Sequence, residues 1–384
     1  MKNKQLLTLA IITLVLLAVG IWMTTSRNSA WQGEGTGAKI IPDLDINKVT
    51  KLAVQGPEAT VTVEFKNDIW GVVERDGYPA KYATLITFLE DLRDLTVAQP
   101  VAAGESQYGR LKLNSLGKDD AGTLVTVTGD DGSEVVSLIF GKDHKGGGRY
   151  LRAKDGKSVM LISKSFYQLG QKASSWLAEE FFKVGDVKEA TLSADGKELW
   201  KVSREKESDE LQLAGDIAAE KEVDTSTLSR VKSAFSSARF SDVASRSGTK
   251  PEDSGLDKAK TYVVREFKGM VHTIVIGKKN DEGKYWVTVA ASYDGPAERP
   301  PVKDEKPEDK ERNDKEFAEN LAKSQKDAAD LNARTKDWVY QMDSWSVDGV
   351  VKTRDELLKD KPKPKEDEAK KDEPKKDEPK KDEK

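Results

Sequence analysis

Short apolar runs alternate with polar turns along most of the chain, and in a few places their period changes from that of a strand to that of a helix. β-Branched residues at alternate positions between glycine, proline and asparagine turns predict half-buried strands. In the first half, such runs are 49–54, 59–65, 69–73, 124–128, 135–140, 150–153 and 159–162. Between the third and fourth runs, apolar residues at helical spacing from Tyr82 to Leu92 predict an amphipathic helix lying on the sheet. A second helix-like stretch is predicted over 166–182.

The same order of elements recurs in the second half. Strands are predicted there over 187–192, 198–203, 211–213, 262–266, 271–276, 285–289 and 338–342, with a short helix from Ser344 onward. Asp224 is the expected N-cap of a covering helix. The apolar face of this helix comprises Leu228, Val231, Phe235 and Ala238.

A matching dipeptide supports an internal repeat. Gly141-Lys142 follows one predicted strand, and Gly277-Lys278 follows its counterpart in the second half. Adjacent strands without crossover helices between them favour antiparallel pairing. The sequence therefore predicts an α+β fold, a tandem duplication of a mostly antiparallel β module with a covering helix, preceded by one transmembrane helix.

The transmembrane helix is predicted from residues 6–23, LLTLAIITLVLLAVGIWM, which contain neither a charge nor a proline. As a helix this run is roughly 27 Å long, just enough to cross a bilayer. Lys2 and Lys4 precede it and favour a cytoplasmic N-terminus, with the body outside the cytoplasm. A cleaved signal peptide is the alternative, but Asn28-Ser29-Ala30 is a poor cleavage context. We therefore expect an uncleaved signal anchor in the cell (inner) membrane.

The predicted organisation has a long insertion in the second module. Proline-rich and charged sequence opens this insertion, 292–336, and continues as a charged helical stretch. The C-terminal tail alternates Lys-Lys with Asp-Glu and has almost no apolar residue, so we expect it to be disordered. The predicted segments are a cytoplasmic N-terminus 1–5, the signal anchor 6–24, a flexible linker 25–45, module 1 over 46–184, module 2 over 185–358, and the tail 359–384.

Composition excludes several functional classes. The chain of 384 residues has no cysteine, which rules out disulfides, thiolate metal sites and cysteine nucleophiles. It also leaves no thiol for lipoprotein acylation. The net charge of −4, in a chain of which 34% is charged, gives no basic field for nucleic acid.

Candidate chemistry is sparse. His272 falls in a predicted strand opposite Val136 of the first copy, which indicates a structural role, and His144 falls in a turn. A metal ligand or general base at either histidine is the alternative. The glycines 146–148 hint at phosphate binding, and 156–158 is the nearest match to a P-loop, but hairpin turns explain both. The sequence predicts no catalytic, cofactor-binding or metal-binding residue and no cofactor.

A resemblance to a known family rests on the order of several weak motifs. These are the apolar anchor, Pro42-Asp43-Leu44 before Val49-Thr50-Lys51-Leu52, Ile69-Trp70, Tyr78-Pro79-Ala80, Tyr108-Gly109 and Trp338-Val339-Tyr340. With these features the chain resembles an uncharacterised bacterial family of membrane-anchored proteins with a domain of unknown function, often encoded beside gliding-motility-type ABC transporters. The family has no established activity, so the resemblance implies no catalytic residues.

The expected function is therefore non-enzymatic. We expect a single-pass extracytoplasmic (periplasmic) protein of unknown specific role, an accessory or scaffold subunit of a membrane complex such as an ABC transporter, with the lipid bilayer and a membrane protein as partners. The alternative is a cell-envelope hydrolase or carbohydrate-binding protein that uses a cleft between the two modules. A third interpretation makes the tail and the insertion a spacer that contacts the cell wall.

Overall fold

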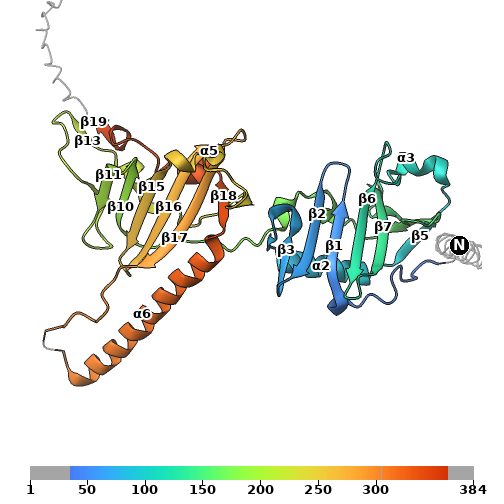
Figure 1. The fold of residues 1–384 in the computed structure, drawn as a ribbon, viewed down its shortest axis with the longest axis horizontal. Helices are drawn as coiled ribbons and strands as arrows, with labels where there is room; N and C mark the ends of the chain where they lie inside the picture. Colours follow the sequence, from blue (N-terminus) through green and yellow to red (C-terminus); the bar gives the residue numbers. More distant parts are fainter. Residues whose placement is uncertain (1–34, 304, 362–384) are drawn as a thin grey trace, which may run out of the picture.

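The computed structural model describes residues 35–303 and 305–361. Within them the protein is a mixed structure of mostly antiparallel sheets with a few helices, and two large sheets lie side by side (Figure 1). We call the sheet within residues 46–184 and its covering elements module 1, and that within residues 185–358 module 2. The predicted mixture of helices and mostly antiparallel strands is confirmed.

Module 1 is built on an antiparallel sheet with the order β4-β3-β2-β1-β6-β7-β8-β9-β5. Its strands are β1 (Val49–Gln55), β2 (Thr60–Lys66), β3 (Ile69–Val72), β4 (Tyr78–Pro79), β5 (Val97–Val101), β6 (Thr123–Gly129), β7 (Glu134–Asp143), β8 (Arg149–Ala153) and β9 (Val159–Ile162). Its helices are α2 (Tyr82–Arg93) and α3 (Tyr108–Leu111), with 3-10 turns η1 (Ile46–Lys48), η2 (Val73–Arg75), η3 (Glu105–Gln107), η4 (Tyr167–Gly170) and η5 (Ala173–Trp176).

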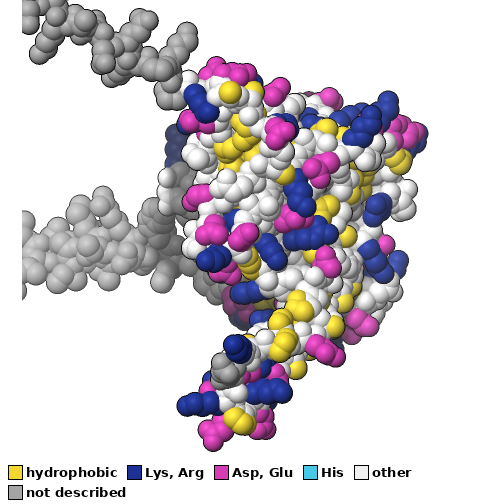
Figure 2. Space-filling view, turned by 90° about the vertical axis from the view of Figure 1, so that its left-hand side faces the viewer, with side chains coloured by type: hydrophobic (Ala, Val, Ile, Leu, Met, Phe, Trp, Pro, Cys, Tyr) yellow, Lys and Arg dark blue, Asp and Glu magenta, His cyan; other side chains and the backbone are white. Residues whose placement is uncertain are grey.

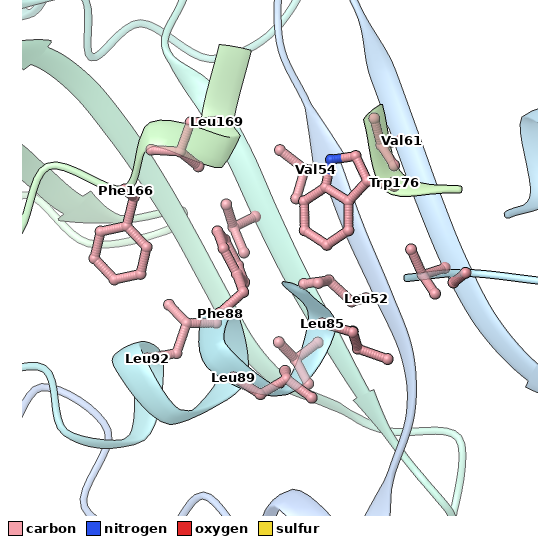
Figure 3. Packing of buried hydrophobic residues seen from close by; sticks show 14 of the residues in the cluster. Leu52, Val54, Val61, Leu85, Phe88, Leu89, Leu92, Phe166, Leu169 and Trp176 are labelled. Atoms are coloured by element: carbon pink, nitrogen blue, oxygen red, sulfur yellow. The ribbon is translucent and has the colours of Figure 1, made fainter. Parts of the chain in front are cut away.

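The core of module 1 lies between the sheet and α2. Alternate side chains of each strand point to one face, so a row of them meets the apolar stripe of the helix. Leu52 of β1 and Phe88 of α2 are fully buried there. Trp176 closes the same core, with its ring centroid 5.8 Å from that of Phe88 (Figure 3). The predicted helix is confirmed, although Tyr82 at its start is 59% exposed.

Module 2 has the sheet order β12-β11-β10-β15-β16-β17-β18-β14 and a small separate ladder of β13 and β19. Its strands are β10 (Val187–Ala194), β11 (Lys197–Ser203), β12 (Gln212–Leu213), β13 (Lys221–Val223), β14 (Asp242–Ser245), β15 (Lys260–Glu266), β16 (Met270–Lys279), β17 (Tyr285–Tyr293), β18 (Trp338–Met342) and β19 (Leu358–Asp360). Its helices are α4 (Thr225–Ser233), α5 (Pro251–Ser254), α6 (Pro307–Thr335) and α7 (Ser344–Val347), with 3-10 turns η6 (Leu256–Lys258) and η7 (Asp355–Leu357).

Helix α4 covers this sheet as expected. The Asp224 side chain accepts a hydrogen bond from the Ser226 backbone N–H at 3.0 Å, so the predicted N-cap is confirmed. Leu228 and Val231 are buried in the module core. The helix ends at Ser233, earlier than its apolar pattern, because the backbone turns out of the helix at Ala234 with ψ 134°, and Phe235 follows with a left-handed φ of 61°. Phe235 is nevertheless buried in the same core.

Helix α6 is the insertion, and only its C-terminal end packs on module 2. Ala328, Leu331 and Thr335 are its buried residues. The Asn332 amide donates to the Ala291 carbonyl oxygen at 2.7 Å and accepts from the Ala291 N–H at 2.8 Å. These bonds satisfy the part of β17 that extends beyond its pairing with β18. The rest of α6 projects away from the sheet, and we call residues 294–327 the arm (Figure 1).

The two modules meet through a compact contact. Arg75 of η2 forms two hydrogen bonds with the Asp242 carboxylate of β14, at 2.6 and 2.7 Å. Beside this pair, the Tyr78 ring lies edge-on to Trp338 and Phe240, with centroid distances of 5.0 and 5.6 Å. Both interactions join residues far apart in the sequence, so the sequence pattern did not predict them.

Three expectations differ from the structure. The stretch 166–182, predicted to be helix-like, contains only the short turns η4 and η5, because Phe166 takes a left-handed φ of 51° and the chain is extended at Gln171. Part of the predicted linker is packed, since the Gly37 N–H and Ile40 N–H bond to carbonyl oxygens at 97 and 95. The first residues of the predicted tail are ordered, because Lys359 and Asp360 belong to β19, which pairs with β13.

The predicted anchor and most of the tail lie outside the described residues. This holds for residues 1–24 and for 362–384. Among residues 35–303 and 305–361, we find no helix with the length and apolar character needed to cross a membrane.

Candidate functional site

A cavity of about 860 Å3 lies in module 2, where three segments converge on its sheet. Residues 177–186, which we call the connector, join η5 to β10 and contribute Phe181 and Phe182, and the segment after α4 contributes Phe240. The base of α6 contributes Leu331 and Arg334. The base of α6 and the connector therefore both line this cavity, next to the point where α6 packs on module 2.

At one side of this cavity His272 is paired with Glu266. The Nε2 of His272 lies 3.1 Å from Oε1 of Glu266, and the same oxygen accepts the Gly185 N–H at 2.7 Å. Burial raises the pKa of Glu266, but the hydrogen bonds from His272 and Gly185 outweigh it and hold that pKa below its ordinary value. Glu266 is therefore ionised at neutral pH and accepts a hydrogen bond from the Nε2 side of the His272 ring.

The other ring nitrogen of His272 does not face an open volume. Its Nδ1 is buried and has no hydrogen-bond partner among the described residues, and the Phe182 ring lies 5.8 Å from the imidazole. A general base needs a path to the proton that it removes. The Glu266–His272 pair is therefore suited to holding the β15–β16 hairpin against the connector, since it also binds Gly185.

Charged side chains at the mouth of the cavity are paired across segments. Arg334 of α6 forms an ion pair with Glu180 of the connector. The neighbouring Glu179 pairs with Lys81 of module 1 at 2.7 Å. These pairs connect three parts of the chain at the surface. The sequence shows Glu179-Glu180 only as one of many acidic pairs, and the structure assigns each carboxylate a basic partner.

The other sequence candidates lie in turns far from this cavity. His144 Nδ1 accepts the Gly146 N–H at 3.1 Å within the β7–β8 turn. A Cβ at Gly148 would overlap the Ile162 carbonyl oxygen, so a close backbone approach explains that glycine. The Gly156 N–H bonds to the Ala153 carbonyl oxygen at 3.1 Å in the turn that precedes β9. These contacts account for both glycine-rich segments without a phosphate.

Metal chemistry has no support in the described part of the chain. No group of three or more His, Asp or Glu side chains there has the arrangement of a metal site. The chain has no cysteine that would add a thiolate. The candidate site is therefore a cavity formed by aromatic residues and ion pairs.

Comparison with known proteins gives one match. The family described as "Domain of unknown function (DUF4340)" matches residues 70–259. The chain contains a DUF4340 domain. No curated protein and no solved structure matches the chain.

The DUF4340 domain does not coincide with either module. It begins in β3 and ends at η6, so it includes most of module 1, the connector and the first part of module 2. It therefore contains Arg75, Asp242 and the connector wall of the cavity, whereas the His272 strand and α6 lie beyond it.

Hairpin geometry gives the one sequence signal that reveals the Glu266–His272 pair. Val264 is directly opposite His272 in the β15–β16 ladder, so Glu266 is its diagonal neighbour on the same face. A predicted hairpin with a fixed register therefore brings the two side chains together. The walls from the connector and α6 have no comparable local signal.

Proposed function

We propose that this protein is a non-enzymatic, single-pass membrane-anchored protein with an extracytoplasmic body. In this proposal it serves as an accessory or scaffold subunit of a membrane complex such as an ABC transporter. The apolar run 6–23 with Lys2 and Lys4 before it supports the anchor and its orientation. The family resemblance supports the transporter, and the DUF4340 domain is consistent with that family.

The arm is the observation on which the scaffold role depends. As a helix, residues 307–327 extend roughly 30 Å beyond the packed base, at about 1.5 Å per residue. Lys, Arg, Asp and Glu side chains intermix along it (Figure 2). Most helical stability in proteins comes from tertiary packing, so the part of α6 that does not pack on the sheet needs support from elsewhere.

An ionic clamp supplies this support at the tip. Arg299, in the loop that leads from β17 out to α6, contacts Asp314 of α6 at 2.6 Å and also pairs with Glu305. Asn313 donates to the other Glu305 oxygen at 2.7 Å. The hydrogen bonds from Arg299 and Asn313 lower the pKa of Glu305. The clamp holds the loop to the helix, and Val302 of this loop is 58% exposed.

We also propose that the two modules arose by tandem duplication. The strand orders β2-β1-β6-β7-β8 and β11-β10-β15-β16-β17 have the same connectivity. Gly141 and Gly277 have the same environment, because a Cβ at either would overlap the carbonyl oxygen of the last residue of a one-turn helix. Those residues are Leu111 of α3 and Ser254 of α5.

The alternative is an envelope hydrolase or carbohydrate-binding protein that uses a cleft between the two modules, and the 860 Å3 cavity is the observation in its favour. Its acids, however, do not suit glycoside hydrolysis, which needs a carboxyl group that stays protonated at neutral pH. Glu266 has a lowered pKa, and Glu180 is paired with Arg334. Binding without hydrolysis is the version of this alternative that the cavity favours.

The scaffold proposal is tested by site-specific photocrosslinking in native membranes. A photoreactive residue at Glu319, exposed on the arm, should give a crosslink to another membrane protein. The same residue at Lys197, exposed in the β10–β11 turn, is the matched control and should not. A full-length, membrane-bound protein that gives no crosslink from the arm, or equal crosslinks from both positions, contradicts the proposal.

Anchoring and topology need a separate measurement. Intact protein should begin at Met1 and sediment with membranes, and its body should be digested by protease added to spheroplasts. A mature protein that lacks residues 6–23, or a body that is protected from the protease, contradicts the anchor.

The third interpretation concerns the tail. In it the tail and the insertion form a spacer that contacts the cell wall, so a protein without residues 362–384 should lose cosedimentation with isolated wall material. Unchanged binding on this deletion would contradict it.

A further inference from the structure

A highly exposed tryptophan lines a second pocket of module 2. Trp345 of α7 is 72% exposed, although burial of an indole is strongly favourable. It lines a pocket of about 420 Å3, whose opposite wall is formed by Arg230 of α4 and the residues that follow that helix. Among the described residues, no other large exposed hydrophobic side chain lines this pocket. The site therefore lacks the apolar area found at the centre of a protein interface.

Hydroxyl groups make up much of the remaining lining. Ser236, Ser237 and Ser346 all line the pocket. The Ser346 Oγ is buried and has no hydrogen-bond partner among the described residues. Because that oxygen is enclosed by the protein, the hydroxyls available to a ligand are those of the exposed Ser236 and Ser237. The left-handed conformation of Phe235 places Ser236 and Ser237 at the surface, where both are exposed.

The charge at this pocket is positive, and Arg230 is its source. Within residues 35–303 and 305–361, Arg230 forms neither an ion pair nor a side-chain hydrogen bond to an acid. By contrast, Asp348 accepts the Tyr285 hydroxyl at 2.8 Å and pairs with Lys279 at 3.1 Å. Lys352 lies 3.8 Å from Glu356. An anionic group in the pocket would therefore meet Arg230, whose guanidinium binds a carboxylate through two parallel hydrogen bonds.

We propose that this pocket binds an acidic saccharide. The apolar face of a sugar ring stacks on the Trp345 indole, the sugar hydroxyls bond to the exposed Ser236 and Ser237, and the sugar carboxylate pairs with Arg230. This binding function is additional to the scaffold role and uses a surface separate from the arm. It does not depend on a membrane partner, so either proposal can fail without the other.

The test is a titration of the full-length protein in detergent micelles with two tetrasaccharides. One is a hyaluronan tetrasaccharide, which contains glucuronic acid and N-acetylglucosamine, and the other is chitotetraose, which contains N-acetylglucosamine alone. Calorimetry and tryptophan fluorescence follow binding up to about 10 mM ligand, which detects a dissociation constant as weak as about 1 mM. The acidic ligand should bind at least about tenfold more tightly than the neutral one.

Matched variants localise the binding. Trp345→Ala and Arg230→Gln should each weaken binding of the acidic ligand about tenfold or more. Arg230→Gln should also remove the preference over chitotetraose. Tyr167→Ala changes an aromatic residue of module 1 that is 70% exposed, and it should leave binding unchanged.

Three results would overturn the proposal. They are no binding of the acidic ligand at the highest concentration, equal binding of both tetrasaccharides, and binding that survives Trp345→Ala. Circular dichroism of each variant checks that the fold is intact. Trp345→Phe, which keeps an aromatic ring, should retain part of the affinity and so separates stacking from any general loss of structure.

Discussion

Replacing Gly277 by alanine tests the close approach between β16 and α5. A Cβ at this position would overlap the Ser254 carbonyl oxygen, and Ser254 is itself fully buried. The helix has little freedom to move away, because Lys278 Nζ donates to the Glu252 carbonyl oxygen at 3.1 Å. Gly255, at the left-handed end of α5, also lies against the Lys278 backbone. The extra methyl group therefore forces strain into a packed backbone.

The expected cost follows from overpacking in well-packed proteins. Forced insertion of a methyl group destabilises by about 1–3 kcal/mol. In a module of this size, each 1 kcal/mol lowers the melting temperature by roughly 2–4 °C. Gly277→Ala should therefore lower the Tm of module 2 by roughly 4–8 °C if the cost is about 2 kcal/mol. Gly141→Ala should act similarly on module 1, where a Cβ would overlap the Leu111 carbonyl oxygen.

Thermal unfolding of the full chain in micelles, followed by circular dichroism, measures this effect. Hydrogen exchange then identifies which module has lost stability. Gly104→Ala is the control, because its Cβ would meet no atom within 4 Å and its φ is negative. It should stay within about 0.5 kcal/mol of the wild type. A Tm of Gly277→Ala within about 1 °C of the wild type would refute the reasoning.

Three further predictions concern other contacts. Arg75→Ala and Asp242→Ala can be combined in a double-mutant cycle measured by urea unfolding. The coupling energy should be about 1 kcal/mol, because the two groups form a bidentate, partly buried pair. A coupling energy of zero would mean that the pair does not stabilise the module contact. Asn332→Ala removes both side-chain hydrogen bonds to Ala291 and leaves buried backbone groups unpaired. It should lower the free energy of unfolding by about 2–4 kcal/mol and speed hydrogen exchange at the Ala291 amide. An unchanged exchange rate there would contradict this. The lowered pKa of Glu266 stabilises the fold above the ordinary glutamate pKa, and this contribution is lost as the pH falls through the lowered folded-state value. Urea unfolding at a series of pH values should therefore show a weaker acid dependence in Glu266→Gln, and an identical pH profile would refute the role of that carboxylate.

Local pattern was sufficient for much of the fold. Period-two runs predicted strands such as β1 and β15, and helical spacing predicted α2, because each of these elements buries one regular face. The Asp224 cap and α6 were predicted from capping chemistry and composition in the same way. The wrong prediction concerned a segment that buries its side chains without the periodicity of a helix or a strand. Residues 166–182 are rich in aromatics but have irregular turns; Phe166 and Trp176 pack into the core of module 1, and Phe182 packs into that of module 2.

Edge strands and sites depend on contacts that the sequence does not display. β5 contains Pro100 and β14 is short, so neither has a strong strand pattern. The cavity near His272 takes its walls from the connector, the end of α4 and α6, which no spacing rule connects. The sequence did not predict that Trp345 is exposed, because a single tryptophan in a short helix is equally compatible with a position in the core.

The two hydrogen bonds between Asn332 and Ala291 also affect whether a truncated protein aggregates. They replace a neighbouring strand along the outer half of β17. If α6 were deleted, that half would present unpaired N–H and C=O groups, which is a template for edge-to-edge aggregation. A truncated protein would therefore self-associate as well as lose the arm, and precipitation of such a variant would reflect an open sheet edge rather than a missing partner.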